Sequence, residues 1–276
     1  MPTDNPAISV VMSVYNSEKY LTKAIESILD QAFADFEFII INDGSTDSSL
    51  SIIESYMAKD DRIVLISREN KGLPASLNEG IAIAKGKYIA RMDADDIALR
   101  DRFKKQMKAL TDHSVDLVFS HANLIDDKGE KICRIFTPDI KTVLRCLFRK
   151  NYLIHPTVIM TKGALKKVGG YNESYKNGQD WDLWKRLKKA GAKFIITEEA
   201  LLNYRYNFNG ITMVRLGKSK DNINYEYSKA CLRNFDTKRL RFFIGGLSIK
   251  YKLVVLCIRF FRLYKIKYMV DINKCI

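Results

Sequence analysis

At 276 residues, the chain is long enough for one large α/β domain, or for a domain of about 200 residues with an appendage. Its five cysteines are an odd number without a CxxC pair, which argues against a disulfide framework or zinc site and for reduced thiols in a cytoplasmic compartment. The net charge of +14 is concentrated at one end. Residues 212–276 hold 15 Lys and Arg against 4 Asp and Glu, which leaves 31 and 28 for residues 1–211. This placement disfavours a nucleic-acid-binding protein, whose basic residues would spread across a binding face.

The first part of the chain alternates short apolar runs with amphipathic segments. The runs at 8–14, 36–41, 63–66 and from 87 onward predict four buried strands. The first run is too short for a signal peptide and has no basic leader. Helices are expected from about 18 to 30 after a cap at Ser17, from a cap at Thr46 or Asp47 through residue 56, and from 73 to 84. This alternation predicts a parallel sheet with helices on both faces, whose ligands bind beyond the carboxyl ends of the strands.

The second part of the chain predicts a mixed arrangement. A charged helix is expected at 100–110, and strands between 117 and 135 joined by a hairpin at 127–129. Next come a helix at 140–149 and a loop with a short strand at 155–160. The last predicted elements are a loop entering a helix at 178–189 and a strand at 193–203. Antiparallel strands therefore join the sheet here.

Three carboxylates crowd the end of the fourth predicted strand. Asp93 and Asp95 are two apart, so in an extended backbone their side chains point the same way. Close carboxylates repel each other, and a divalent cation with oxygen ligands relieves this. A solvated turn that caps the next helix is the alternative, and Asp96 is expected to be such a cap. Because residues 15–16 and Asp43 follow two other predicted strands, a shared ligand site is favoured.

The loop after the first strand excludes several nucleotide-binding schemes. It contains no glycine, so the GxGxxG of a Rossmann dehydrogenase is missing, and the chain has no P-loop. A phosphatase of the haloacid dehalogenase type would carry its paired aspartates on the first strand. A nucleotide could still bind without a glycine-rich loop. A tyrosine ring would cover the nucleobase, an aspartate would accept a hydrogen bond from it, and a metal would bind the phosphates.

The region 8–96 resembles the family 2 glycosyltransferases, which are inverting enzymes with the GT-A fold. The resemblance rests on motifs in family order and spacing: Val14-Tyr-Asn-Ser-Glu-Lys-Tyr-Leu21, Asn42-Asp-Gly-Ser-Thr-Asp47, Asn70-Lys-Gly-Leu73, Asn78-Glu-Gly-Ile81, Ala84-Lys-Gly-Lys-Tyr-Ile89 and Met92-Asp-Ala-Asp-Asp96. It continues more weakly through His155-Pro-Thr-Val and Gln179-Asp-Trp-Asp-Leu-Trp184, so it covers about residues 8–206. The chain looks most like bacterial transferases that build O-antigen or capsule repeat units.

The resemblance implies a UDP-sugar site around the DxD motif. Asp93 would touch the ribose, and Asp95 would coordinate Mn²⁺ or Mg²⁺, which neutralises charge on the leaving diphosphate. Asp43 would bind the uracil ring nitrogen, with a simple turn residue as the alternative. The other implied nucleotide contacts are Ser13, Tyr15, Asn16 and, if it is not merely a solvated lysine, Lys71.

The resemblance also implies where the acceptor hydroxyl loses its proton. Asp180 matches the Asp of the family's Glu-Asp pair and would be the catalytic base, although it could instead cap its helix. Gln179 replaces the family's frequent Glu, which should make Asp180 less basic. Asp182 ranks second, because it points elsewhere on a helix. His155 and Trp181 are candidate acceptor contacts, and a structural histidine is the alternative for His155.

The predicted organisation is a GT-A domain at 1–211 with a nucleotide-sugar half at 1–111 and an acceptor half at 112–211. A basic amphipathic helical tail is expected at 212–276. The uncharged run between Lys252 and Arg259 is too short to span a bilayer, so the tail would lie in the membrane interface or pack on protein. Peripheral attachment to the cytoplasmic face of the bacterial inner membrane would present a lipid-linked saccharide acceptor.

The sequence thus predicts a metal-dependent hexosyltransferase for O-antigen or capsular polysaccharide. By resemblance, it would transfer glucose or galactose in β-1,3 linkage to GlcNAc-diphosphoundecaprenol. A GT-A-like nucleotidyltransferase is an alternative, although it usually carries a Gly-rich basic loop after its first strand, and a basic nucleic-acid-binding protein is another.

Overall fold

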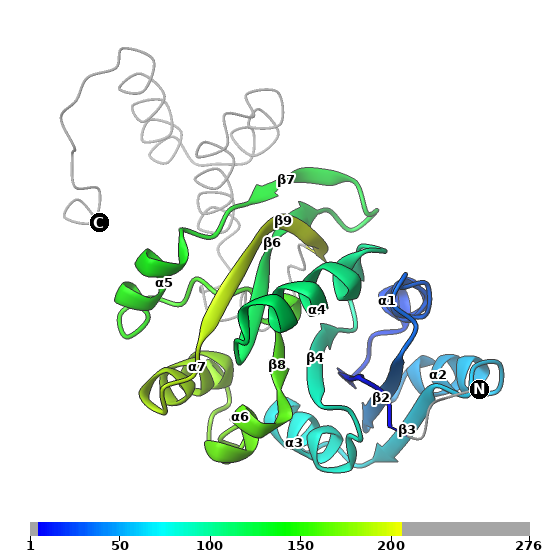
Figure 1. Cartoon of the computed structure of the whole chain (residues 1–276). Helices are drawn as coiled ribbons and strands as arrows, with labels where there is room; N and C mark the ends of the chain where they lie inside the picture. The colour runs from blue at the N-terminus through cyan, green and yellow to red at the C-terminus, as the bar shows by residue number, and fades with distance from the viewer. Residues whose placement is uncertain (1–4, 206–276) are drawn as a thin grey trace, which may run out of the picture. The chain divides into compact units, whose positions relative to one another are not determined.

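The computed structural model describes residues 5–205. These residues form a nine-stranded sheet with helices on both faces (Figure 1). The tail predicted at 212–276 lies outside the described residues. Among the helices within 5–205, none is long and apolar enough to cross a membrane.

The first half of the sheet is parallel, as the alternation of segments predicts. Strand β1 lies between β2 and β4, and β2 pairs in turn with β3. The elements are β1 (Ile8–Val14), α1 (Glu18–Leu29), β2 (Phe36–Asp43), α2 (Ser49–Met57), β3 (Ile63–Arg68), α3 (Leu73–Ile83) and β4 (Tyr88–Asp93). The central strands are buried on both faces, which explains their continuous apolar sequence.

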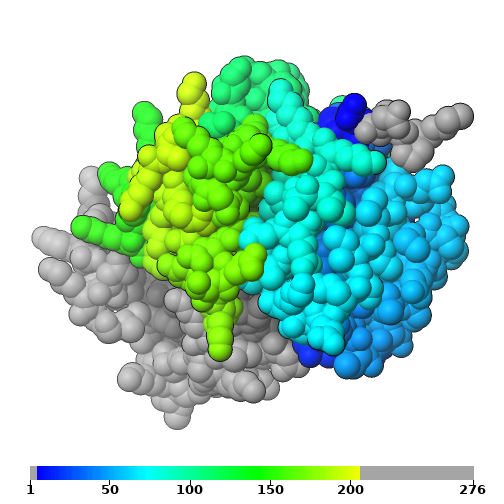
Figure 2. Space-filling view, turned by 90° about the horizontal axis from the view of Figure 1, so that it is seen from below, coloured from blue at the N-terminus to red at the C-terminus, as the bar shows by residue number. Residues whose placement is uncertain are grey.

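The second half extends the same sheet with antiparallel pairings. The path is β3-β2-β1-β4-β8-β6-β9-β5, with β7 paired to β6 through the predicted hairpin. Its elements are β5 (Ile97–Ala98), α4 (Arg102–His113), β6 (Leu117–Ile125), β7 (Lys131–Ile135), α5 (Ile140–Cys146), the 3₁₀ turn η1 (His155–Thr157), β8 (Ile159–Thr161), α6 (Lys162–Lys167), α7 (Gln179–Lys189) and β9 (Phe194–Arg205). The two halves therefore share one sheet, and Figure 2 shows them side by side across one face.

Two apolar cores lie on opposite faces of the sheet. Helices α1, α2 and α4 bury residues such as Ile25, Ile53 and Phe103 in the first core. Helices α3, α5, α6 and α7 bury Leu77, Leu183 and others in the second. Alternate residues of β1 divide between the two cores, as the period of a strand requires. Helix α7 is thereby fixed to the face that also carries α3.

The second helix is capped by Asp47, one of the two predicted residues: its carboxylate accepts from the backbone N–H of Ser49, the first residue of α2 (2.9 Å), although Ser48 occupies the cap position. The predicted cap of the first helix is wrong in detail. The Ser17 hydroxyl donates to the Tyr15 carbonyl (3.1 Å) and does not cap α1. Instead Asp47 accepts from the backbone N–H of Glu18 (3.0 Å), while Glu18 accepts from that of Ser48 (2.9 Å). Side chains from two helix starts thus cap one another across 29 and 30 positions, a contact that local pattern does not reveal.

Other elements differ from the sequence expectation at their boundaries. The helix predicted at 140–149 ends at Cys146, and the charged helix begins at Arg102 and continues to His113. The sequence prediction missed the two-residue strand β5 and the short helix α6. Both are too short to carry a periodic signal.

A buried polar clip joins the start of β4 to β1 and β2. The Ser9 hydroxyl donates to Glu37 (2.6 Å), which also accepts from the backbone N–H of Lys85 (2.6 Å). The backbone N–H of Gly86 donates to Ser9 (2.8 Å). A Cβ on Gly86 would lie 2.6 Å from the backbone nitrogen of Ser9, so only glycine allows this approach.

We expect Gly86→Ala to destabilise the domain by about 1–3 kcal/mol, because backbone must move to admit the methyl group. Gly163→Ala is the matched control. Nothing lies within 4 Å of its added Cβ in α6, and helical alanine gains about 0.5–1 kcal/mol over glycine. Urea unfolding measures both variants, and equal midpoints would contradict the expectation.

Candidate active site

The register of β1 between its neighbours brings the predicted residues to one edge. Ser13 lies opposite Asp93 of β4, and Val14 lies opposite Asn42 of β2. Asp43 lies opposite Arg68 at the end of β3. Because these strands are parallel, their carboxyl ends meet at the same edge of the sheet. Residues far apart in sequence therefore surround one region.

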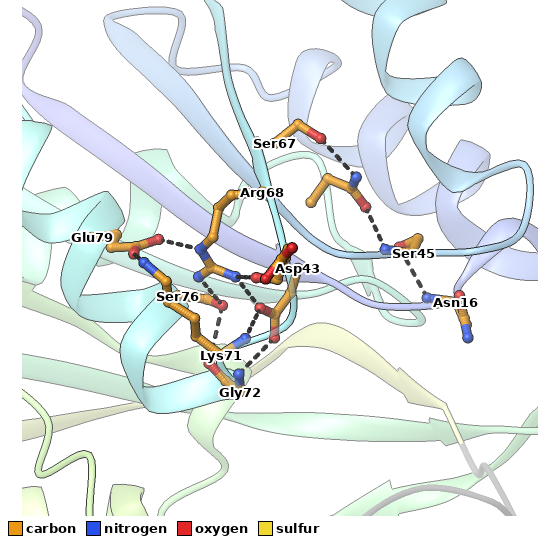
Figure 3. Close-up of polar contacts among 11 residues, drawn as sticks. Asn16, Asp43, Ser45, Ser67, Arg68, Lys71, Gly72, Ser76 and Glu79 are labelled. Atoms are coloured by element: carbon orange, nitrogen blue, oxygen red, sulfur yellow. Dashed lines mark hydrogen bonds and ion pairs between the residues drawn. The ribbon is translucent and has the colours of Figure 1, made fainter.

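Asp43 is buried and holds the loop that follows β3 (Figure 3). Its two oxygens accept from the backbone N–H groups of Lys71 (2.8 Å) and Gly72 (3.0 Å), and it pairs with the guanidinium of Arg68. A turn residue with a solvated side chain would make none of these contacts. Asp43 is thus a fixed acceptor at the base of the site.

Arg68 links Asp43 to helix α3. Its Nε donates to Glu79 (2.7 Å) and its Nη2 to Ser76 (2.9 Å). The ammonium of Lys71 also pairs with Glu79 (3.1 Å), and its side chain is 58% exposed. Lys71 contacts Asp43 only through its backbone N–H. The side chain of Lys71 is therefore mostly exposed to solvent beside Glu79.

The loop after β1 is held by Asn16, which has a positive φ of 48°. The Asn16 side-chain oxygen accepts from the backbone N–H of Thr46 (2.8 Å). The backbone N–H of Asn16 donates to the Ser45 hydroxyl (3.1 Å). Tyr15 is 52% exposed beside it, while Ser13 is half-buried in β1. Asn16 therefore shapes the loop, and the ring of Tyr15 is the exposed surface that a planar base can cover.

A buried arginine lies behind the first aspartate of the DxD motif. Arg91 is two residues before Asp93 on β4, so their side chains lie on the same face. The Arg91 Nη1 is 2.5 Å from Asp93, in a charge pair that lacks the alignment of a hydrogen bond. Arg91 is 2% exposed, and within residues 5–205 its Nε has no hydrogen-bond partner. Such a buried charge is costly, and its position indicates a functional role.

Asp96 does not cap the following loop or helix, so that prediction is wrong. It is buried, and its carboxylate accepts from the backbone N–H of Arg205 in β9 (2.8 Å). Burial, with the charges of Asp95 and Asp93, raises the pKa of Asp96 well above its usual range. The Nε of Arg205 also donates to the carbonyl of Asp95 (2.7 Å). The end of β9 thus holds the DxD loop in place.

A second buried arginine, Arg102 of α4, supports the same loop from the other side. Its Nη2 donates to the carbonyl of Arg91 (2.8 Å) and its Nε to Gln106 (3.1 Å). Burial lowers the pKa of Arg102 to about 9, which leaves it a cation at neutral pH. It therefore balances part of the negative charge of the three aspartates.

Asp180 lies in the first turn of α7, and its side chain is not the helix cap. Gly178 occupies the cap position, with a positive φ of 75°. The Asp180 carboxylate accepts from the Asn151 amide (2.8 Å), whose own oxygen accepts from the Leu153 N–H (3.1 Å). Burial raises the pKa of Asp180, against the hydrogen bonds it accepts and the positive charge of Arg91. A raised pKa suits a carboxylate that must take up a proton.

Asp182 is engaged elsewhere. Its carboxylate pairs with Arg186 one turn later in α7 (2.7 Å). This contact agrees with its second rank as a candidate base.

His155 belongs to a packed aromatic cluster. Its Nε2 is 2.7 Å from the Tyr171 hydroxyl, and its ring meets Trp184 edge-on with centroids 5.7 Å apart. Burial, with the positive charge of Arg91, lowers the pKa of His155 well below its usual value. These contacts favour the alternative of a structural, neutral histidine close to the site.

The two tryptophans of α7 have different environments. Trp184 is fully buried in the core. Trp181 is half-buried, and its Nε1 donates to the carbonyl of Leu147 (2.5 Å) while the Lys185 ammonium lies over its ring. Trp181 therefore fastens the end of α5 to α7.

The residues around the DxD loop suit a metal that is shared with a phosphate ligand. Among residues 5–205, no group of three His, Cys, Asp or Glu side chains converges on a metal-sized site. Asp93 pairs with Arg91 and Asp96 is buried, whereas Asp95 is half-exposed. Mg²⁺ often takes only one or two carboxylates, with its remaining ligands from phosphates and water. The donor set fits a metal of this kind.

The family model "Glycosyl transferase family 2" matches residues 9–168. This chain is a family 2 glycosyltransferase. The match decides between the transferase and the nucleotidyltransferase that the sequence motifs left open.

Curated relatives include several glycosyltransferases. The chain is 41% identical over 224 residues to an uncharacterised glycosyltransferase of Methanocaldococcus jannaschii, covering 79% of this chain and 77% of the relative. It is 32% identical over 235 residues to the O-antigen biosynthesis glycosyltransferase WbnJ of Escherichia coli, covering 84% and 90%. It is 34% identical over 233 residues to the putative glycosyltransferase EpsE of Bacillus subtilis, covering 83% of each chain.

Solved structures share the GT-A fold of this transferase. S. aureus TarS 1-349, solved in complex with UDP-GlcNAc, has a TM-score of 0.63 and 21% identity, with coverage of 87% of this chain and 70% of that TarS fragment. The mannosyltransferase PcManGT of Pyrobaculum calidifontis, solved with GDP-Man and Mn²⁺, has a TM-score of 0.61 and 16% identity, with coverage of 96% and 82%.

Five arginine and asparagine residues of the site were missed from sequence: Arg68, Arg91, Arg102, Asn151 and Arg205. Arg91 could have been found, because it shares a strand face with Asp93. Asn151 contacts Asp180 across 29 positions, and Arg205 contacts Asp96 across 109. No local pattern signals contacts of that range.

The lowered pKa of His155 predicts a pH dependence of stability. The unfolded chain protonates this histidine near pH 6.5, whereas the folded protein does so only at lower pH. The unfolded state then binds more protons, so this group reduces stability as pH falls below about 6.5, by up to about 1.4 kcal/mol per pH unit.

Urea unfolding between pH 5.5 and 7.5 measures this term as the difference between wild type and His155→Gln. We expect the variant to lose less stability on acidification. In NMR spectra, the His155 ring should remain neutral at pH 6, and normal titration near pH 6.5 would contradict the expectation.

Proposed function

We propose that this glycosyltransferase moves a hexose from a UDP-sugar to a hydroxyl of a lipid-diphosphate-linked sugar, with inversion and with a divalent metal. The observation that carries the proposal is the position of Arg91. It pairs with Asp93 of the DxD motif, and its charge acts on Asp180 at the start of α7. Asp93, the proposed donor-binding carboxylate, and Asp180, the proposed base, are thus both close enough to feel the charge of the buried Arg91.

The donor is proposed to bind along the carboxyl edge of β1, β2 and β4. Asp43 accepts from the imide N–H of uracil, the exposed ring of Tyr15 covers the base, and Ser13 and Asn16 border it. Asp93, held by Arg91, accepts from a ribose hydroxyl. The fixed loop at Lys71 and Gly72 closes this side of the nucleotide site.

A metal would be held by Asp95 together with the diphosphate of the donor. When bound, Mn²⁺ or Mg²⁺ supplies positive charge that stabilises the leaving nucleoside diphosphate. The chain itself fixes Asp95 through the Arg205 contact to its carbonyl. This rigidity keeps the half-exposed Asp95 carboxylate at the donor edge.

Transfer is proposed as a single displacement. The acceptor oxygen attacks the anomeric carbon and forms the new glycosidic bond, while the bond from that carbon to the diphosphate oxygen breaks with its electron pair. Asp180 takes the hydroxyl proton as the attack proceeds. Attack from the side opposite the leaving group converts an α-linked donor into a β-linked product.

The proposed acceptor is a lipid-linked saccharide on the cytoplasmic face of the bacterial inner membrane. The O-antigen biosynthesis enzyme WbnJ among the relatives supports this setting. β-1,3 transfer of glucose or galactose to GlcNAc-diphosphoundecaprenol is the specific reaction we propose. UDP-Glc, UDP-Gal, UDP-GlcNAc and UDP-GalNAc should be compared on a synthetic acceptor, with product linkage read by NMR. Product from none of them would refute the proposal.

Asp180→Asn should lower kcat by about 10²- to 10⁴-fold, because the amide cannot accept the hydroxyl proton. Donor binding, measured by calorimetry with UDP and Mn²⁺, should be unchanged. Asp182→Asn is the control, because Arg186 already engages that carboxylate. Near-normal turnover in Asp180→Asn would remove it as the base.

Asp95→Ala should abolish the metal dependence of donor binding. In wild type, UDP should bind at least about tenfold more tightly with Mn²⁺ or Mg²⁺ than with chelator present. Asp112→Ala, which removes an exposed carboxylate of α4, serves as the control. If Asp95→Ala keeps the metal effect on UDP affinity, then another ligand holds the metal.

A further inference from the structure

A basic surface lies beside the candidate base on the acceptor half. The segment 140–152 contains four Lys or Arg residues and no Asp or Glu. Around the end of α5, Arg145, Arg149 and Lys150 are exposed, and Phe148 is 47% exposed among them. We call this surface, together with Lys188 and Lys189 of α7, the basic shelf.

The positive charge of the shelf is not balanced by neighbouring acids. The ammonium groups of Lys188 and Lys189 lie 4.9 and 5.8 Å from the centre of the Phe148 ring. Asp182 is occupied by Arg186, and Asp139 caps the far end of α5. In the part of the chain that the structure describes, no Lys or Arg of the shelf forms an ion pair with a carboxylate. Gathered cations of this kind repel one another, and a bound anion relieves the repulsion.

The shelf is a fixed surface. Leu147 is fully buried, and its carbonyl accepts from Trp181 of α7 (2.5 Å). The ammonium of Lys188 donates to the carbonyl of Leu144. These contacts hold the end of α5 on α7, so its basic side chains project from a rigid base.

The shelf also begins next to the residue that positions Asp180. Lys150 immediately precedes Asn151, whose amide donates to the Asp180 carboxylate (2.8 Å). A molecule whose hydroxyl reaches Asp180 therefore binds next to the segment that begins the shelf. An anionic group at its far end would meet Arg and Lys side chains there.

We propose that the basic shelf binds the phosphate or diphosphate at the reducing end of the acceptor. Arginine matches phosphate oxygens with two parallel N–H groups, and lysine adds point charge. Phe148 would lie against the apolar part that adjoins the phosphate. This inference rests on the proposed transfer to a phosphorylated acceptor, and it assigns that acceptor a recognition site on α5 and α7.

The test compares two water-soluble acceptor analogues with the same sugar, one a short-chain alkyl diphosphate and the other a neutral alkyl glycoside. Their binding is measured by calorimetry in wild type and in Arg149→Ala/Lys150→Ala. Wild type should bind the diphosphate more tightly, and the double variant should lose that preference by about tenfold to a hundredfold, as for charge-assisted hydrogen bonds. Binding of the neutral analogue, and of UDP with Mn²⁺, should be unchanged.

Lys104→Ala/Lys108→Ala removes the same charge from exposed positions of α4, on the opposite face of the sheet, and should leave the preference intact. Equal binding of the two analogues in wild type, or an unchanged preference in Arg149→Ala/Lys150→Ala, would overturn the proposal. So would a loss confined to binding of anionic vesicles, which would assign the shelf to the membrane surface. If wild type binds the diphosphate analogue but transfers no sugar to it, the proposed function fails while the shelf stands.

Discussion

The site depends on the way buried arginines hold the loop that carries three crowded carboxylates. Asp93, Asp95 and Asp96 lie together at the end of one strand, and burial with the charges of Asp95 and Asp93 raises the pKa of Asp96. Arg91 pairs with Asp93, Arg102 supports the backbone beneath it, and Arg205 binds the backbone of Asp95 and the carboxylate of Asp96. Each arginine comes from a different element. The loop therefore keeps its shape only when β4, α4 and β9 are all in place.

This arrangement also connects the two halves of the enzyme. Arg91 belongs to the first, parallel half of the sheet, yet its charge reaches Asp180, His155 and Tyr171 among the elements of the second half. A buried guanidinium with one carboxylate partner is unfavourable for stability alone. Its cost is consistent with the proposed site, in which Asp93 binds the donor and Asp180 is the base. Gln179, where the family often has Glu, is buried beside Asp180 and adds no second negative charge.

The proposed base, Asp180, depends on the residues that hold its helix and its carboxylate in position. Asp180 begins a helix that packs through Leu183 and Trp184 into the core shared with α3. Asn151 then orients the carboxylate, and the Trp181 contact with Leu147 fixes the end of α5. The same contacts present the basic shelf at a fixed place beside Asp180. The proposed base and the proposed acceptor phosphate site are therefore held by the same contacts between α5 and α7.

Much of this enzyme was determined by its sequence alone. The parallel half of the sheet followed from apolar runs that alternate with amphipathic segments, because strands buried on both faces are mostly apolar. The DxD motif and Asp43 stood out because each ends such a strand. What only the tertiary structure decided was the partners of these residues. Asp96 was expected to cap a helix but anchors β9, and Ser17 yields its capping role to Asp47. These contacts join residues 29 to 109 positions apart, and local periodicity carries no information about such distances. They arise from packing of the whole domain, which decides where each charge is paired.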